Sequence, residues 1–247
     1  MHDTTVQDVP AGRLQVEANR RAAVSAGVLF IAATVASVVG TGLSRPFVDD
    51  PDYLGKVSAH AGALSAGALL EFIAAAASAV IAISLYPVLR DQGARLALGA
   101  VVFRTAEAIS YMVATASLLS VLALSQRLTA AGAVDPRSFR AIGDSLLDLR
   151  EQVTLIGVFA FSVGALSYYY LFYRSGLIPR WLSGWGVVAI ILTMIACLLA
   201  LFEQRPLTTY IIILLPIAAQ EMVMAVWLIV KGFGSKGLRF ERRGRRA

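Results

Sequence analysis

Six apolar runs of about 20 residues constrain the fold of this chain more than any other feature. They lie at 22–43, 62–89, 96–125, 153–173, 182–202 and 208–230. About 20 apolar residues in a helix cross the ~30 Å hydrocarbon core of a bilayer. Each run is too long for a strand and lacks two-residue alternation, so each is predicted to be a helix. The sequence therefore predicts an all-α, polytopic integral membrane protein with six transmembrane helices in one bundle.

The composition excludes an ordinary soluble domain. Hydrophobic residues make up 57% of the 247 residues and charged residues 15%, whereas soluble domains average about 45–50% and about 25%. No polar stretch is long enough for a separate soluble domain. We predict a membrane domain at 20–232, with a cytoplasmic N-terminal tail at 1–19 and a basic cytoplasmic tail at 233–247.

The charges between the runs predict the orientation in the membrane. The two termini and every second connection carry 14 basic residues against 5 acids, while the other connections carry 7 against 8. Because basic residues concentrate on the cytoplasmic side, both termini are predicted to be cytoplasmic.

The basic C-terminal tail predicts contact with membrane lipids. Each Lys or Arg near an anionic leaflet contributes about 1 kcal/mol of attraction. This accounts for the pI of about 9.8 without nucleic acid as a partner, since the tail lacks the interleaved stacking residues of such a surface.

The longest outside connection, between the third and fourth runs, contains a helical pattern. An N-cap residue, a proline at the first helical position and apolar residues at helical spacing predict a short amphipathic helix on the outer face or capping the bundle. The residues are Asp135, Pro136, Phe139, Ile142, Leu146 and Leu149.

Four ionisable residues lie well inside the runs, near the predicted bilayer midplane: Glu71, Arg104, Glu107 and Glu221. A charge at that depth costs about 2.5–3.5 kcal/mol, so these residues are expected to face one another, or water, inside the bundle. They form the candidate binding site.

Two further polar residues join this candidate site. Tyr111 continues the face of Arg104 and Glu107 one turn further on. In the last run Pro216 removes a backbone hydrogen bond, and Gln220 and Glu221 follow about one turn later.

Three carboxylates and one guanidinium leave two negative charges unbalanced. We expect Arg104 to pair with Glu71 or Glu221 of a neighbouring helix. The two other carboxylates then need a bound cation, water or protonation.

Enzyme motifs are absent from the sequence, which favours a protein that is not an enzyme. It contains no metalloprotease, hydrolase or phosphate-loop motif. Its one cysteine and two histidines do not form a core metal or haem site. We therefore assign no catalytic residue, metal site or cofactor. The aromatic residues near the cytoplasmic end of the fourth run are predicted to form an interfacial belt. They are Tyr168, Tyr169, Tyr170, Phe172, Tyr173 and Trp181.

Several segments resemble those of a known family. They are 147–152, 171–180 and 216–232, together with 85–89 and the Phe103-Arg104 pair. The chain resembles bacterial six-helix membrane proteins grouped as domain of unknown function family 4386. The resemblance implies a multi-pass protein of the bacterial plasma membrane and implies no activity for any residue. This chain departs from the family pattern at Arg150, where members often carry a histidine.

Three functions stay open for the buried charges. The cluster can bind a proton, a polar solute or a lipid head group, as in a transporter, sensor or lipid-binding module. It can instead only fix helix packing in a membrane scaffold, or serve an intramembrane lipid-modifying enzyme. A cavity wider than a water molecule at Glu71 and Glu221 favours binding, whereas a dry, fully paired cluster favours packing. The small-molecule ligand itself is not identified by the sequence.

Overall fold

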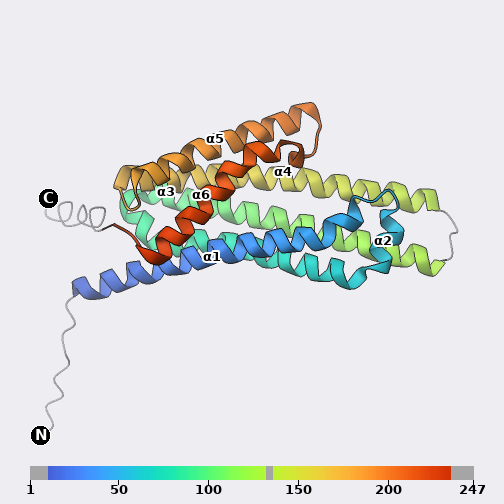
Figure 1. Ribbon diagram of the computed structural model, residues 1–247, viewed down its shortest axis with the longest axis horizontal. Helices are drawn as coiled ribbons and strands as arrows, with labels where there is room; N and C mark the ends of the chain where they lie inside the picture. The colour runs from blue at the N-terminus through green and yellow to red at the C-terminus, as the bar shows by residue number, and fades with distance from the viewer. Residues whose placement is uncertain (1–10, 132–135, 235–247) are drawn as a thin grey trace, which may run out of the picture.

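The computed structural model describes residues 11–131 and 136–234, and the described residues form helices and short connections without a strand. The helices are α1 (Ala11–Val48), α2 (Tyr53–Ala59), α3 (Ala61–Ala131), α4 (Pro136–Ser175), α5 (Arg180–Glu203), the 3₁₀-helix η1 (Leu207–Tyr210) and α6 (Ile211–Val230). They lie lengthwise beside one another, with α6 crossing α1 (Figure 1). The predicted all-helical class is confirmed.

Five of these helices, α1, α3, α4, α5 and α6, are long and apolar enough to cross a membrane. Large apolar side chains remain exposed along them, for example Phe202 at 80% and Ile212 at 78%. A soluble monomer rarely exposes so much contiguous apolar surface. The structure is therefore that of a multi-pass membrane protein.

The two helices predicted at 62–89 and 96–125 are present as two arms joined at a kink within α3. Its 71 residues would span about 105 Å if straight. Only Gly93 leaves helical geometry, with φ 172° and ψ 88°, and the two arms on either side of it lie next to each other (Figure 1). The connection between the two arms is shorter than the polar segment 90–95 suggests, because one extended residue, Gly93, is enough to reverse the direction of the helix.

The prediction of a short amphipathic helix between the third and fourth runs is wrong, because that segment is the beginning of α4. The helix starts at Pro136, as expected, but continues without a break to Ser175. At 40 residues it measures about 60 Å, twice the hydrocarbon thickness. Asp135, the predicted N-cap, lies outside the described residues. Of the predicted apolar face, Phe139 and Leu146 pack against Tyr53 and its neighbours, whereas Ile142 and Leu149 are exposed.

Polar contacts tie the beginning of α4 to α2. The Tyr53 hydroxyl donates to Asp144 Oδ1 at 2.8 Å, and Arg140 donates to the Pro51 carbonyl at 2.8 Å. Burial, together with the Asp144 hydrogen bond, raises the pKa of Tyr53 well above its usual value. The phenol therefore stays a hydrogen-bond donor at all physiological pH values.

The connections lie at two opposite ends of the bundle. At one end Arg20 donates to the carbonyls of Leu228 and Ile229, the last turn of α6, and Gly234 donates to Leu177 in the α4–α5 connection. At the other end Arg45 of α1 donates to Thr208 of η1 at 3.1 Å. Successive connections lie at alternate ends of the bundle, so the connections that are rich in basic residues lie at the same end.

Helix α1 and the first arm of α3 approach closely at two glycines. A Cβ added to Gly40 would lie 2.9 Å from the Gly67 carbonyl oxygen, and one added to Gly67 would lie 2.8 Å from that of Gly40. Both obstacles are backbone atoms, which cannot turn aside as a flexible side chain can. The small residues here hold Glu71 against α1.

Replacement of Gly40 by valine is expected to destabilise the protein by about 1–3 kcal/mol, because the added methyl groups force α1 away from α3. Thermal unfolding of the purified protein in detergent micelles measures this. Gly42→Val is the matched control, since a Cβ at Gly42 meets nothing within 4 Å. Equal melting temperatures for the two variants would contradict the close packing.

Candidate functional site

A cavity of about 460 Å³ lies between α1, α3, α4, α5 and α6. Ligand pockets usually measure about 300–1,000 Å³, so the space is far larger than a single water molecule requires. Five charged residues line it, namely Glu71, Arg104, Glu107, Arg150 and Glu221. The remaining wall is formed by apolar side chains and by hydroxyl-bearing residues such as Thr34, Ser37 and Thr41 of α1.

Helical spacing explains why α1 presents hydroxyls to this space. Thr34, Ser37 and Thr41 are three and four residues apart and so share one face of the helix. Phe30 precedes them on the same face and also lines the cavity. Val35, between them in sequence, is 55% exposed on the outer side.

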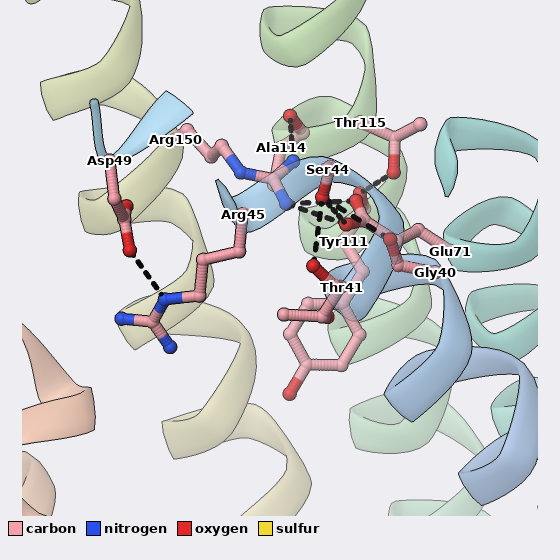
Figure 2. A network of polar contacts seen from close by, with 10 residues as sticks. All are labelled: Gly40, Thr41, Ser44, Arg45, Asp49, Glu71, Tyr111, Ala114, Thr115 and Arg150. Atoms are coloured by element: carbon pink, nitrogen blue, oxygen red, sulfur yellow. Dashed lines mark hydrogen bonds and ion pairs between the residues drawn. The ribbon is translucent and has the colours of Figure 1, made fainter. Parts of the chain in front are cut away.

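An ion pair between α3 and α4 forms part of the cavity wall, and Figure 2 shows its polar contacts. Arg150 Nη2 donates to Glu71 Oε1 at 2.8 Å and to Oε2 at 2.9 Å. The Ser44 hydroxyl donates to Glu71 Oε1 at 3.3 Å, and Arg150 Nη1 donates to the Ala114 carbonyl at 3.0 Å. The side chains of Arg150 and Glu71 are only 19% and 12% exposed.

The Arg150 contact corrects the sequence interpretation, which counted this residue among the outside charges. The fourth helix begins before Arg150, and so its guanidinium reaches a carboxylate 79 positions away in the chain. The sequence analysis did not place Arg150 in the candidate site, and its departure from the family pattern is the one signal that could have pointed to it. Counting the charges between the hydrophobic runs could not reveal that Arg150 pairs with Glu71.

The second ion pair lies within one arm of α3. Arg104 Nη1 is 3.0 Å from Glu107 Oε2, and their side chains are 4% and 6% exposed. The Arg104 guanidinium also lies 4.9 Å from the ring centroid of Phe161, a cation–π distance. The prediction that Arg104 pairs with Glu71 or Glu221 is therefore wrong, because a carboxylate one turn away on its own helix is closer.

Glu221 is left without an ion-pair partner among the described residues. Tyr168 donates to its Oε1 at 3.4 Å, a long hydrogen bond. Arg104 acts on it electrostatically but is already paired with Glu107. Glu221 is thus the carboxylate that carries the excess charge of the cavity.

Tyr168 also corrects the predicted aromatic belt. Tyr168, Tyr169 and Phe172 are fully buried in the central core, whereas Tyr170 and Tyr173 are exposed. Three consecutive tyrosines on a helix cannot all face lipid, since they point about 100° apart. Helical spacing alone did not indicate which of them would face the bundle.

The structure separates Gln220 from the other candidate residues. Its Oε1 accepts a hydrogen bond from the Tyr169 hydroxyl, and its Nε2 donates to the Leu182 carbonyl at 3.1 Å. Gln220 therefore ties α6 to α4 and α5 on the side away from the cavity. Tyr111 does line the cavity, next to Thr115, whose hydroxyl donates to the Tyr111 carbonyl at 2.9 Å.

Three buried polar atoms in the cavity wall have no hydrogen-bond partner within the described residues: Ser78 Oγ, Arg104 Nε and Glu107 Oε2. Glu107 Oε2 retains only its ion pair with Arg104. Buried polar atoms are normally satisfied by protein or by ordered water. Their clustering around one cavity is typical of a site that holds water or a ligand.

The formal charges lining the cavity sum to −1. Three glutamates face two arginines, and each arginine is paired with a glutamate. In residues 11–131 and 136–234 no three His, Cys, Asp or Glu side chains are grouped closely enough to hold a metal ion.

Comparison with known families gives a match over most of the chain. The sequence model of a family described as "Domain of unknown function (DUF4386)" matches residues 25–232. Neither the curated proteins nor the solved structures contain a match.

Proposed function

Because this chain belongs to the family described as domain of unknown function DUF4386, which carries no assigned activity, we propose its function from the cavity. The protein binds a small polar ligand inside the membrane, between α1, α3, α4 and α6. The observation that carries this proposal is the ~460 Å³ cavity whose wall includes five charged residues. A scaffold would gain nothing from such a space, because empty volume forfeits packing energy.

The same proposal includes a topology. The two arms of α3 each cross the membrane, so that the chain makes six passes. The end that contains Arg20 and the α4–α5 connection faces the cytoplasm of a bacterial cell. The proposal also keeps anionic lipids of the plasma membrane as partners of the basic tail at 233–247, of which 235–247 lie outside the described residues. The excess of basic residues at that end of the bundle supports this orientation.

Binding can be tested by blocking the cavity. We expect ligand-dependent stabilisation of the purified protein in lipid nanodiscs, measured as a rise in melting temperature with three solutes of equal shape: choline, its neutral carbon isostere 3,3-dimethylbutan-1-ol and the anion 3,3-dimethylbutanoate. A ligand at one hundred times its dissociation constant stabilises the folded state by about 2.7 kcal/mol. Thr34→Phe fills part of the cavity and should abolish the rise.

The matched control is Val35→Phe, which makes a similar change on the exposed side of α1. It should retain the response of the wild-type protein. If none of the three solutes raises the melting temperature, or if Thr34→Phe responds like Val35→Phe, the cavity is not the ligand site.

A further inference from the structure

We infer that the ligand of this cavity is a small organic cation, an alkylammonium group, with Glu221 as its counter-ion. The inference rests on the proposed ligand-binding function and names the chemical class of the ligand. The alkylammonium group belongs either to a free amine or to the head group of a lipid, since both present the same chemistry to the cavity.

The charges of the cavity disfavour an anionic ligand. Both guanidinium groups in the wall are paired with carboxylates, Arg150 with both oxygens of Glu71 and Arg104 with Glu107. Arg104 Nε keeps a hydrogen-bond donor without a partner among the described residues, but an anion there would add a second negative charge to a cavity whose formal charge is already −1. A cation instead neutralises that charge.

Glu221 supplies the charge that a cation requires. It is the one lining carboxylate without an ion pair among the described residues, and the formal charge of the cavity is −1. An unpaired carboxylate away from water is costly. A monovalent cation beside Glu221 neutralises the cavity.

The walls next to Glu221 favour an organic cation over a metal ion. Leu214, Ile217 and Ala218 precede Glu221 on the same face of α6, and all three line the cavity. Calcium requires six to eight oxygen ligands, and one free carboxylate beside apolar side chains does not provide them. Alkyl groups on nitrogen, in contrast, bury apolar surface against these walls.

The cavity wall across from Glu221 carries hydroxyl and aromatic groups that can contact the substituents of the cation. Thr34, Ser37 and Thr41 bring hydroxyls from α1, and Phe30 and Tyr111 bring aromatic rings. Hydroxyls accept and donate hydrogen bonds, and aromatic faces attract alkylammonium groups. The cavity thus has an anionic end on α6 and a hydroxyl-lined side on α1.

The test compares choline with 3,3-dimethylbutan-1-ol, which has the same shape without the charge. Binding is measured by isothermal titration calorimetry to the full-length protein in phosphatidylglycerol nanodiscs, whose lipids carry no ammonium group. We expect choline to bind at least tenfold more tightly than the isostere. Glu221→Gln should remove this preference, whereas Glu151→Gln, a matched change at an exposed position of α4, should retain it.

A second arm distinguishes the two sources of the cation. Phosphatidylethanolamine is added to the nanodiscs, and choline binding is measured again. A weaker apparent affinity for choline means that the lipid head group occupies the cavity, and an unchanged affinity means that the ligand is a free amine. Both results support the ammonium assignment.

The inference and the proposed function fail in different ways. If choline and the isostere bind equally and both are blocked by Thr34→Phe, the cavity binds a ligand but the ammonium assignment is overturned. If neither solute binds, the ammonium assignment is overturned, and if 3,3-dimethylbutanoate does not raise the melting temperature either, the proposed function falls as well. Should Glu221→Gln fail to fold, the comparison of choline with its isostere on the wild-type protein still decides.

Discussion

Replacement of Arg104 by methionine is expected to lower the free energy of unfolding by about 3–5 kcal/mol, because it leaves Glu107 as a buried charge without its partner. The two side chains are 4% and 6% exposed, so water in the cavity replaces the lost guanidinium only in part. Methionine fills a similar volume and favours helix, which confines the change to charge and hydrogen bonding. Equilibrium unfolding in mixed detergent micelles, followed by circular dichroism, measures the effect.

The double variant Arg104→Met with Glu107→Leu separates loss of the pair from loss of packing. Removing both charges of a buried pair is often neutral or stabilising, so the double variant should regain most of the lost stability. The pair would then be architectural, and ligand binding would rest on Glu221. A double variant as unstable as Arg104→Met would contradict this division, as would a single variant with wild-type stability.

Replacement of Arg150 by methionine is expected to cost about 2–3 kcal/mol, since it removes two charge-assisted hydrogen bonds to Glu71 and one to a backbone carbonyl. The expected loss is smaller than at Arg104 because the two side chains are 19% and 12% exposed. Glu71 retains only the hydrogen bond from Ser44. The same unfolding measurement applies.

Two comparisons make the Arg150 result specific. Arg127→Met, an equal change at an exposed position of α3, should leave stability within about 0.5 kcal/mol of wild type. Arg150→Lys should recover only part of the loss, since Arg150 reaches Glu71 and the Ala114 carbonyl with two separate nitrogens, whereas lysine has one. If Arg127→Met and Arg150→Met have the same effect, the Arg150–Glu71 pair does not hold α3 against α4.

The positions of the membrane helices followed from the sequence, because hydrophobic length is a local property. The apolar runs at 182–202 and 208–230 lie within α5 and within η1 and α6. The connections were harder to predict. A one-residue reversal at Gly93 and a continuous α4 depend on how neighbouring helices pack, and Gly93 lies against Leu171 of α4.

Part of the candidate site also followed from the sequence. Glu71, Arg104, Glu107, Tyr111 and Glu221 all line one cavity, as expected from the cost of placing charge among lipids. Gln220 was grouped with them by its neighbour in sequence, yet adjacent residues of a helix point about 100° apart. Whether these residues bind a ligand is a question for the experiments above.

What the sequence by itself determined is the class of the protein: its apolar length, low charge and basic connections specify helices in a membrane before any contact is known. Only the tertiary structure decided which charges meet. Arg150 reaches Glu71 across 79 positions, whereas Arg104 turns to Glu107 three positions away. Burial is read from the composition of a segment, but an ion pair depends on the distance between side chains, and that distance is set only when the helices pack. The packing is what leaves Glu221 unpaired beside a cavity.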